Sequence, residues 1–164
     1  MSKILFLDVD SVLNTGRTPT RWDDAGNIIA QDPEKVFMVN KMVEITVPDL
    51  KVVLCSDWRH LPKWRETMKA NGHVYEFLDR TPDLRKTGKT DEEIDAASLA
   101  RATRGFEINA WLSEHPEVTH WAWIDDCDET IPGQKENFFK TEYGIGLTDE
   151  ICENVVRHLT KRDC

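Results

Sequence analysis

Three short runs of apolar residues stand out along the chain, and each ends abruptly at a polar residue. The runs are residues 4–7, 52–55 and 121–124, and the polar residues that follow them are Asp8, Ser56 and Asp125. Apolar residues are continuous within these runs, which is typical of strands covered on both faces in a parallel sheet. We therefore predict three buried strands of one parallel sheet.

Helical patterns separate the predicted strands. Apolar side chains recur at helical spacing, with capping signals, over residues 33–45, 62–70, 90–102, 106–112 and a last segment from residue 148 onward. Strands that alternate with helices predict an α/β fold, here a Rossmann-like three-layer α/β/α sandwich around a parallel sheet. The 164 residues are about the length of one domain, so residues 1–164 are expected to form a single domain.

Two stretches lack a clear pattern. Residues 15–32 are typical of a flap or hairpin, and residues 80–89 form a charged loop. Both follow predicted strands, so both are expected to overhang the edge of the sheet where the strands end. Because the chain between Asp10 and Ser56 holds only one predicted helix and this flap, the fold is expected to be capless or to carry a minimal flap.

The composition is that of a globular protein, with 40% hydrophobic and 31% charged residues. No apolar run approaches the ~20 residues that span a bilayer, and no secretory signal is evident, so we expect a cytoplasmic protein without a membrane partner. The net charge of −9 argues against non-specific coating of nucleic acid. The four cysteines form no C-x-x-C pair, so no zinc site is expected.

Acidic residues gather at two of the predicted strand ends. Asp8 and Asp10 follow the first strand, and Asp125 and Asp126 follow the third. Because the carboxyl ends of parallel strands lie at one edge of the sheet, these carboxylates are expected to lie close together and to repel one another. A hard, oxygen-preferring cation such as Mg²⁺ would relieve that repulsion, so we predict Mg²⁺ as the cofactor.

Five motifs, in order along the chain, resemble those of the haloacid dehalogenase (HAD) superfamily of phosphohydrolases. They read DVDSVLN (8–14), SDWR (56–59), RGFEINAWL (104–112), WIDD (123–126) and TEYGIGLT (141–148). The resemblance is greatest to the small, nearly capless branch associated with nucleic-acid repair proteins, and it extends from residue 4 to about residue 159. The family usually has glycine where this chain has Ser11.

This resemblance implies a role for each matched residue. Asp8 would be the nucleophile that forms an aspartyl-phosphate, and Asp10 would be the general acid and then the general base. Ser56 and a cation would hold the phosphate; Arg104 is the family-matched cation, and Lys86 or Lys89 is the alternative. The residues implied as metal ligands are Asp8, Asp10, Asp125 and Asp126.

Further residues are candidates for contact with substrate. They are Ser11, Asn14, Ser56, Asp57, Arg59 and Trp22. For Arg59 the competing interpretation is a solvated side chain beside a packed Trp58, and Ser56 is also a candidate helix cap.

Three hypotheses for function remain open on the sequence. The first is a Mg²⁺-dependent phosphatase that acts on a nucleotide or a nucleic-acid end, since an open site admits a large substrate. The second is a phosphatase of another small phosphomonoester. The third is a non-hydrolytic phospho-aspartate switch, which the early D-x-D and the late D-D motifs disfavour.

Overall fold

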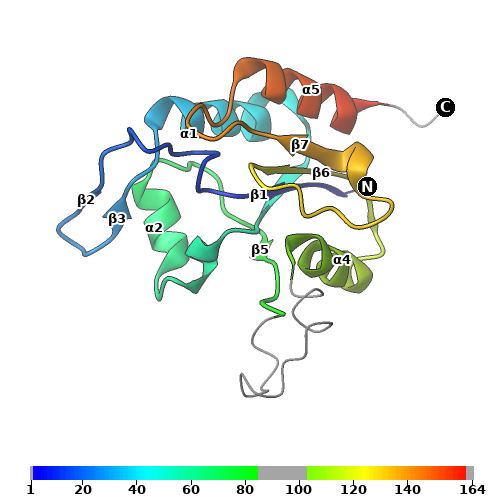
Figure 1. Cartoon of the computed structure of the whole chain (residues 1–164), viewed down its shortest axis with the longest axis horizontal. Helices are drawn as coiled ribbons and strands as arrows, with labels where there is room; N and C mark the ends of the chain where they lie inside the picture. Colours follow the sequence, from blue (N-terminus) through cyan, green and yellow to red (C-terminus); the bar gives the residue numbers. More distant parts are fainter. Residues whose placement is uncertain (1, 85–102, 162–164) are drawn as a thin grey trace.

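A five-stranded parallel sheet forms the centre of the molecule (Figure 1). The computed structural model describes residues 2–84 and 103–161. The strands run in the order β5-β4-β1-β6-β7, and every neighbouring pair is parallel. Their bounds are Ser2–Leu7 (β1), Leu50–Leu54 (β4), Asp79–Arg80 (β5), Val118–Asp125 (β6) and Phe138–Lys140 (β7). The predicted α/β fold with a parallel sheet is confirmed.

The register of the three central strands brings their carboxyl ends to one level. Leu7 of β1 pairs with Leu54 of β4 on one side and with Ile124 of β6 on the other. The pairing continues past the strand, because the Asp8 amide donates to the Ile124 carbonyl at 3.1 Å. The polar residues that follow these strands therefore lie at one edge of the sheet.

Helices cover both faces of this sheet (Figure 1). α1 (Pro33–Lys41) and α5 (Asp149–Thr160) cover one face, and α4 (Arg104–Glu114) covers the other. Successive residues of β1 alternate between the two hydrophobic clusters, with Leu5 and Leu7 facing α1 and α5, and Ile4 and Phe6 facing α4. Burial on both faces explains why the strands read as continuous apolar runs.

The helix boundaries differ from the sequence prediction at several points. The first helix ends its regular α-helical part at Lys41 and continues as one π-helical turn, Met42–Thr46. α2 (Trp64–Ala70) begins two residues later than predicted, because Pro62 precedes the helix instead of opening it. A short 3-10 turn, η2 (Asp57–His60), was not predicted. The predicted helix over 90–102 lies outside the described residues.

The predicted flap is a small hairpin. β2 (Arg21–Trp22) and β3 (Ile28–Ile29) pair antiparallel. The hairpin is attached to the end of α2, since the Asn71 side-chain oxygen accepts hydrogen bonds from the amides of Ala30 and Gln31. A hairpin of this size is a minimal flap and not a separate cap domain. No helix in the described part of the chain is long and apolar enough to cross a membrane.

The loop after β1 holds a serine in the left-handed backbone region. Ser11 has a φ of 60°. Hydrogen bonds at both backbone groups of Ser11 close the loop. The Ser11 amide donates to the Asn14 side-chain oxygen at 3.0 Å, and the Thr141 hydroxyl donates to the Ser11 carbonyl at 2.9 Å. Left-handed backbone costs an L-residue with a side chain roughly 1–2 kcal/mol, a cost that glycine does not have.

Replacing Ser11 with glycine is expected to stabilise the protein. The relief of backbone strain is partly offset by the larger conformational entropy of glycine in the unfolded chain, so the free energy of unfolding should rise by up to about 1 kcal/mol. Urea denaturation measures this change. Asp49→Gly is the matched control, because Asp49 has a φ of 62° outside this loop. A lower free energy of unfolding in Ser11→Gly, without a lower one in Asp49→Gly, would contradict the strain argument.

Candidate active site

The candidate site forms where three strand ends meet the first turn of α4. Asp8 follows β1, Ser56 follows β4 after one intervening residue, Asp125 ends β6, and Arg104 opens α4. Asp8, Ser56 and Asp125 are buried. The Ser56 hydroxyl hydrogen-bonds to Asp8, and both Arg104 and Asp125 are close enough to change the pKa of Asp8. Residues more than 100 positions apart thus share one small volume.

Burial and like charge make it energetically unfavourable for Asp8 and Asp125 to be ionised at the same time. Burial raises the pKa of Asp8 well above its usual range, and the neighbouring Asp125 raises it further. Burial likewise raises the pKa of Asp125 to about 6, against the lowering effect of Arg104 and of a hydrogen bond from the Cys127 amide. A pair of this kind is stabilised in its ionised form by an added cation.

Asp125 is held in place by its own strand and the turn after it. The Trp123 indole donates to Asp125 Oδ2 at 3.1 Å, and the Cys127 amide donates to Oδ1 at 3.0 Å. Each carboxylate oxygen can accept a second interaction, so these hydrogen bonds orient Asp125 and leave it able to act as a ligand.

The acidic end of β6 offers side-chain ligands for a metal. Side-chain ligand atoms of Asp125, Asp126 and Cys127 lie within 4.8 Å of one another. This group includes neither Asp8 nor Asp10. Carboxylate oxygens suit Mg²⁺, whereas a thiol does not, and burial together with Asp126 raises the pKa of Cys127. The carboxylates and the raised pKa of Asp8 fit a hard divalent cation.

Arg104 is placed to balance negative charge at the site. Its guanidinium nitrogens lie 3.9 Å from Asp125, 3.8 Å from Glu107 and 4.0 Å from Asp57, beyond hydrogen-bonding distance of all three. Its buried Nη1 has no hydrogen-bond partner among the described residues. A buried donor without a partner costs free energy, and a phosphoryl oxygen would satisfy it. The alternative cations Lys86 and Lys89 lie outside the described residues.

Asp10 is exposed and is held by two donors. Its Oδ1 accepts hydrogen bonds from the Asn14 side-chain amide at 2.9 Å and from the Trp58 indole at 3.2 Å. Asn14 therefore both closes the loop after β1, through the Ser11 amide, and orients Asp10.

Arg59 is buried and is not solvated. Only 1% of the surface of Arg59 is exposed. Its two terminal nitrogens bond both oxygens of Glu107 at 2.8 Å, and one of them also donates to the Thr81 hydroxyl at 2.9 Å. The pair ties η2 to α4, and Glu107 lies one turn after Arg104 on the same helix. Arg59 thus has a structural role that the sequence did not indicate.

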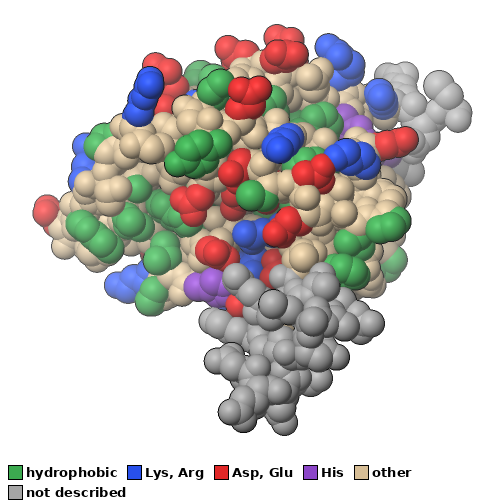
Figure 2. All heavy atoms as spheres, viewed as in Figure 1, with side chains coloured by type: hydrophobic (Ala, Val, Ile, Leu, Met, Phe, Trp, Pro, Cys, Tyr) green, Lys and Arg blue, Asp and Glu red, His purple; other side chains and the backbone are tan. Residues whose placement is uncertain are grey.

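The other candidate substrate residues differ in their exposure. Asp57 opens η2 and is exposed, and Trp22 lies on the hairpin with 67% of its surface exposed. Ser56 also accepts the Trp58 amide at 3.4 Å, so it acts as the cap of η2 and as a partner of Asp8. On the face drawn in Figure 2, acidic side chains surround a basic cluster near the centre of the molecule.

Three residues that support the site were missed by the sequence analysis. Glu107 bonds Arg59, Trp123 orients Asp125, and the Thr141 amide donates to the Asp125 carbonyl at 2.9 Å. All three lie within motifs quoted for the resemblance, so the motifs contained the signal. Their roles depend on contacts across the fold, which spacing alone does not reveal.

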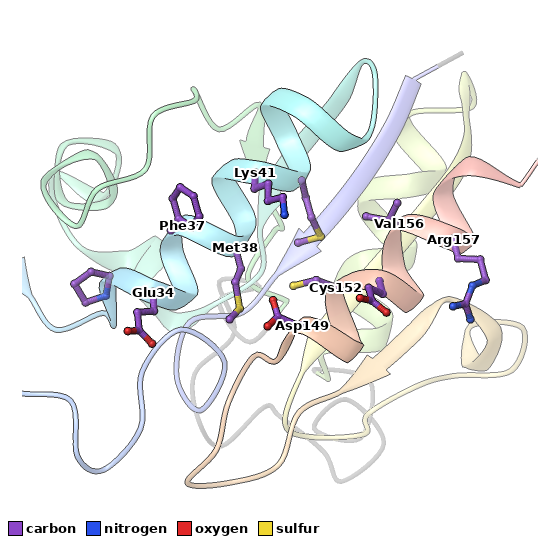
Figure 3. Close-up of a pocket in the computed structure, with 11 residues that line it drawn as sticks. Glu34, Phe37, Met38, Lys41, Asp149, Cys152, Val156 and Arg157 are labelled. Carbon is purple, nitrogen blue, oxygen red and sulfur yellow. The ribbon is translucent and has the colours of Figure 1, made fainter.

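A large groove of the described structure lies away from these residues (Figure 3). It measures about 730 Å³ and runs between α1 and α5. Phe37 and Met38 line it from α1, and Cys152 and Val156 line it from α5. None of its lining residues belongs to the candidate site, so its size carries no weight in assigning the chemistry.

Comparison with known families agrees with the motifs. Residues 4–152 match the family described as the HAD domain in Swiss Army Knife RNA repair proteins. No curated protein matches the chain. Since the family match covers most of the 164 residues, including the three strand ends and Arg104, the chain belongs to the HAD domain family of Swiss Army Knife RNA repair proteins.

Proposed function

We propose that this protein is a Mg²⁺-dependent phosphohydrolase that removes a terminal phosphate from a nucleotide or polynucleotide end through an aspartyl-phosphate. Membership of the HAD family supports a phosphatase-type activity. The observation that carries the proposal is the setting of Asp8, a buried carboxylate bonded by Ser56 and flanked by Arg104 and Asp125. A nucleophile, a hydroxyl donor and a cation are thereby collected at one sheet edge.

In the first half-reaction, a side-chain oxygen of Asp8 attacks phosphorus. The bond from phosphorus to the leaving oxygen breaks, and that oxygen takes a proton from Asp10. Asp10 suits this role because it is exposed at the mouth of the site and is oriented by Asn14 and Trp58. The products are the alcohol and an aspartyl-phosphate on Asp8.

In the second half-reaction, water attacks the phosphorus of the aspartyl-phosphate. Asp10, now ionised, takes a proton from that water, and the bond between phosphorus and the Asp8 oxygen breaks. Inorganic phosphate leaves, and both aspartates return to their starting protonation states. One residue serves as acid and then as base because the two half-reactions run in sequence.

Two hydrogen-bond donors and the residues that hold Mg²⁺ are proposed to bind the phosphate. The Ser56 hydroxyl and the Arg104 Nη1, which has no partner among residues 2–84 and 103–161, are the proposed donors to phosphoryl oxygens. Asp8, Asp10, Asp125 and Asp126 are the proposed residues that hold Mg²⁺. When bound, Mg²⁺ would offset the repulsion between an anionic nucleophile and an anionic phosphate.

The proposed substrate is a phosphate at a nucleic-acid end. The family description names RNA repair, and the hairpin is too short to enclose a substrate completely. Ser11, Asn14, Asp57 and Trp22 are the proposed substrate contacts at the rim.

Asp8→Asn is expected to abolish phosphatase activity, with a loss on the order of 10³-fold or more, because the amide cannot form the covalent intermediate. Stability should be equal or higher, since the change removes a buried charge that Asp125 repels. Phosphate release from p-nitrophenyl phosphate with Mg²⁺ measures the activity, and thermal unfolding measures the stability. Asp24→Asn, on the exposed hairpin, is the control. Near-normal turnover by Asp8→Asn would refute the assignment of the nucleophile.

Removal of divalent ions is expected to stop the reaction. Without the cation, the raised pKa of Asp8 leaves less of the reactive carboxylate, and the repulsion between nucleophile and phosphate is unscreened. Activity should be lost in EDTA and restored by excess Mg²⁺. Full activity in the chelator would exclude the proposed metal role.

Phosphates at oligonucleotide ends are expected to be the better substrates. The comparison uses oligonucleotides with a 3′-phosphate or a 5′-phosphate, mononucleotides and sugar phosphates, each ranked by kcat/KM. We expect one type of oligonucleotide end to exceed the sugar phosphates by at least about ten-fold, which corresponds to ~1.4 kcal/mol of transition-state binding. A clear preference for sugar phosphates would refute the nucleic-acid proposal and leave the phosphatase proposal standing.

A further inference from the structure

The groove between α1 and α5 has an apolar lining that reaches the surface at an aromatic side chain. Phe37 and Met38 line it from α1, and Cys152 and Val156 line it from α5 (Figure 3). Phe37 is 66% exposed, whereas Cys152 is buried. The groove therefore lies beside a ridge of α1 that carries Phe37. An apolar surface that charged residues border is typical of a protein–protein interface.

The charged residues that line this groove are separated by sign along its length. Glu34 and Asp149 lie in the first turns of α1 and α5, and Lys41 and Arg157 lie in the last turns. The two helices run in the same direction, so both first turns lie at one end of the groove (Figure 3). Glu153 lies between the two ends. One end of the groove is therefore acidic, and the other end is basic.

A second copy of this chain carries the pattern that matches this groove. A two-fold rotation reverses the direction of the groove, so the acidic end of one copy meets the basic end of the other. In α1, positions 34 and 41 and positions 37 and 38 are symmetric about one point midway between 37 and 38. With α1 antiparallel to its copy about that point, Glu34 lies opposite Lys41 of the second copy, and Phe37 lies opposite Met38 of the second copy.

The charges of the groove favour a second copy over a partner of a single charge sign. Three acidic and two basic residues line the groove, so a uniformly basic or acidic segment would be attracted at one end and repelled at the other. A second copy matches both ends. Lys41 is exposed and also interacts within its own chain, so the pairing requires no unpartnered lysine.

We propose that this groove is a two-fold interface between two copies of this chain. Phe37 of each copy packs into the groove of the other, near Cys152 and Val156, and Glu34 pairs with Lys41 across the two-fold axis. None of the residues that line the groove belongs to the candidate active site, so the association uses no residue of that site.

The oligomeric state of the full chain tests the interface. In sedimentation velocity from about 1 to 200 µM, the wild-type protein is expected to change from monomer to dimer, as an interface with a micromolar Kd does. A monomer at every concentration would overturn the proposal.

Phe37→Glu tests whether the groove is the surface of contact. It places a charge in the apolar part of the interface and should raise the Kd of the dimer at least about ten-fold. Because Phe37 is 66% exposed, the variant is expected to fold. Trp22→Glu is the matched control, since Trp22 is 67% exposed and lies outside the groove, and it should keep the wild-type Kd. An unchanged Kd in Phe37→Glu would overturn the proposed interface.

Reversal of charge tests the two-fold arrangement. Glu34→Lys and Lys41→Glu each place like charges opposite one another at two equivalent contacts, so each should raise the Kd about five-fold or more. The double variant restores opposite charges in both copies and should recover a Kd within about three-fold of the wild type. Both reversals oppose the helix dipole of α1, so a change in helix stability does not explain a recovery. A double variant as weak as the single variants would contradict this arrangement.

The outcomes separate this inference from the proposed function. Phosphate release from p-nitrophenyl phosphate, measured per chain, should be the same in Phe37→Glu and in the wild type. An active protein that stays monomeric would overturn the interface alone. A dimer that releases no phosphate from any monoester in Mg²⁺ would overturn the proposed function alone.

Discussion

Two buried carboxylates, Asp8 and Asp125, are brought together at the ends of neighbouring parallel strands, and the rest of the site is arranged around the repulsion between them. Burial raises the pKa of both groups, and the charge of Asp125 raises the pKa of Asp8 further. The protein offsets part of this cost with Arg104 and with hydrogen bonds from Ser56, Trp123 and the Cys127 amide. The remaining unfavourable charge is the physical reason that the site suits a divalent cation.

The support behind the site connects elements that are far apart in sequence. Arg59 and Glu107 form a buried pair with two short contacts at 2.8 Å, which joins the turn after β4 to α4. Because Arg104 opens that helix, the pair helps to fix where its guanidinium lies. Removing one partner of such a pair leaves an uncompensated buried charge, so the pair favours one arrangement of η2 and α4 over alternatives. Thr141 supports the other side by bonding both Asp125 and Ser11 through its backbone and hydroxyl.

The hairpin is the element that relates chemistry to substrate. Its strands are only two residues long, so it leaves the site open on the side of Asp10. Alternation along these strands directs Ile28 to a pocket that Asp10 also lines, and Arg21 to another pocket.

The sequence by itself determined the parallel sheet, the strand ends and the family, because buried parallel strands are continuous apolar runs and the reactive residues directly follow them. It also indicated the hairpin from the turn-forming residues over 15–32. Only the tertiary structure decided the place of Arg59, which charge alone suggested was solvated and which is buried against Glu107. The same holds for the left-handed Ser11 and for the Arg104 nitrogen that has no partner in the described part of the chain, since each depends on which distant residues the fold brings within a few ångströms.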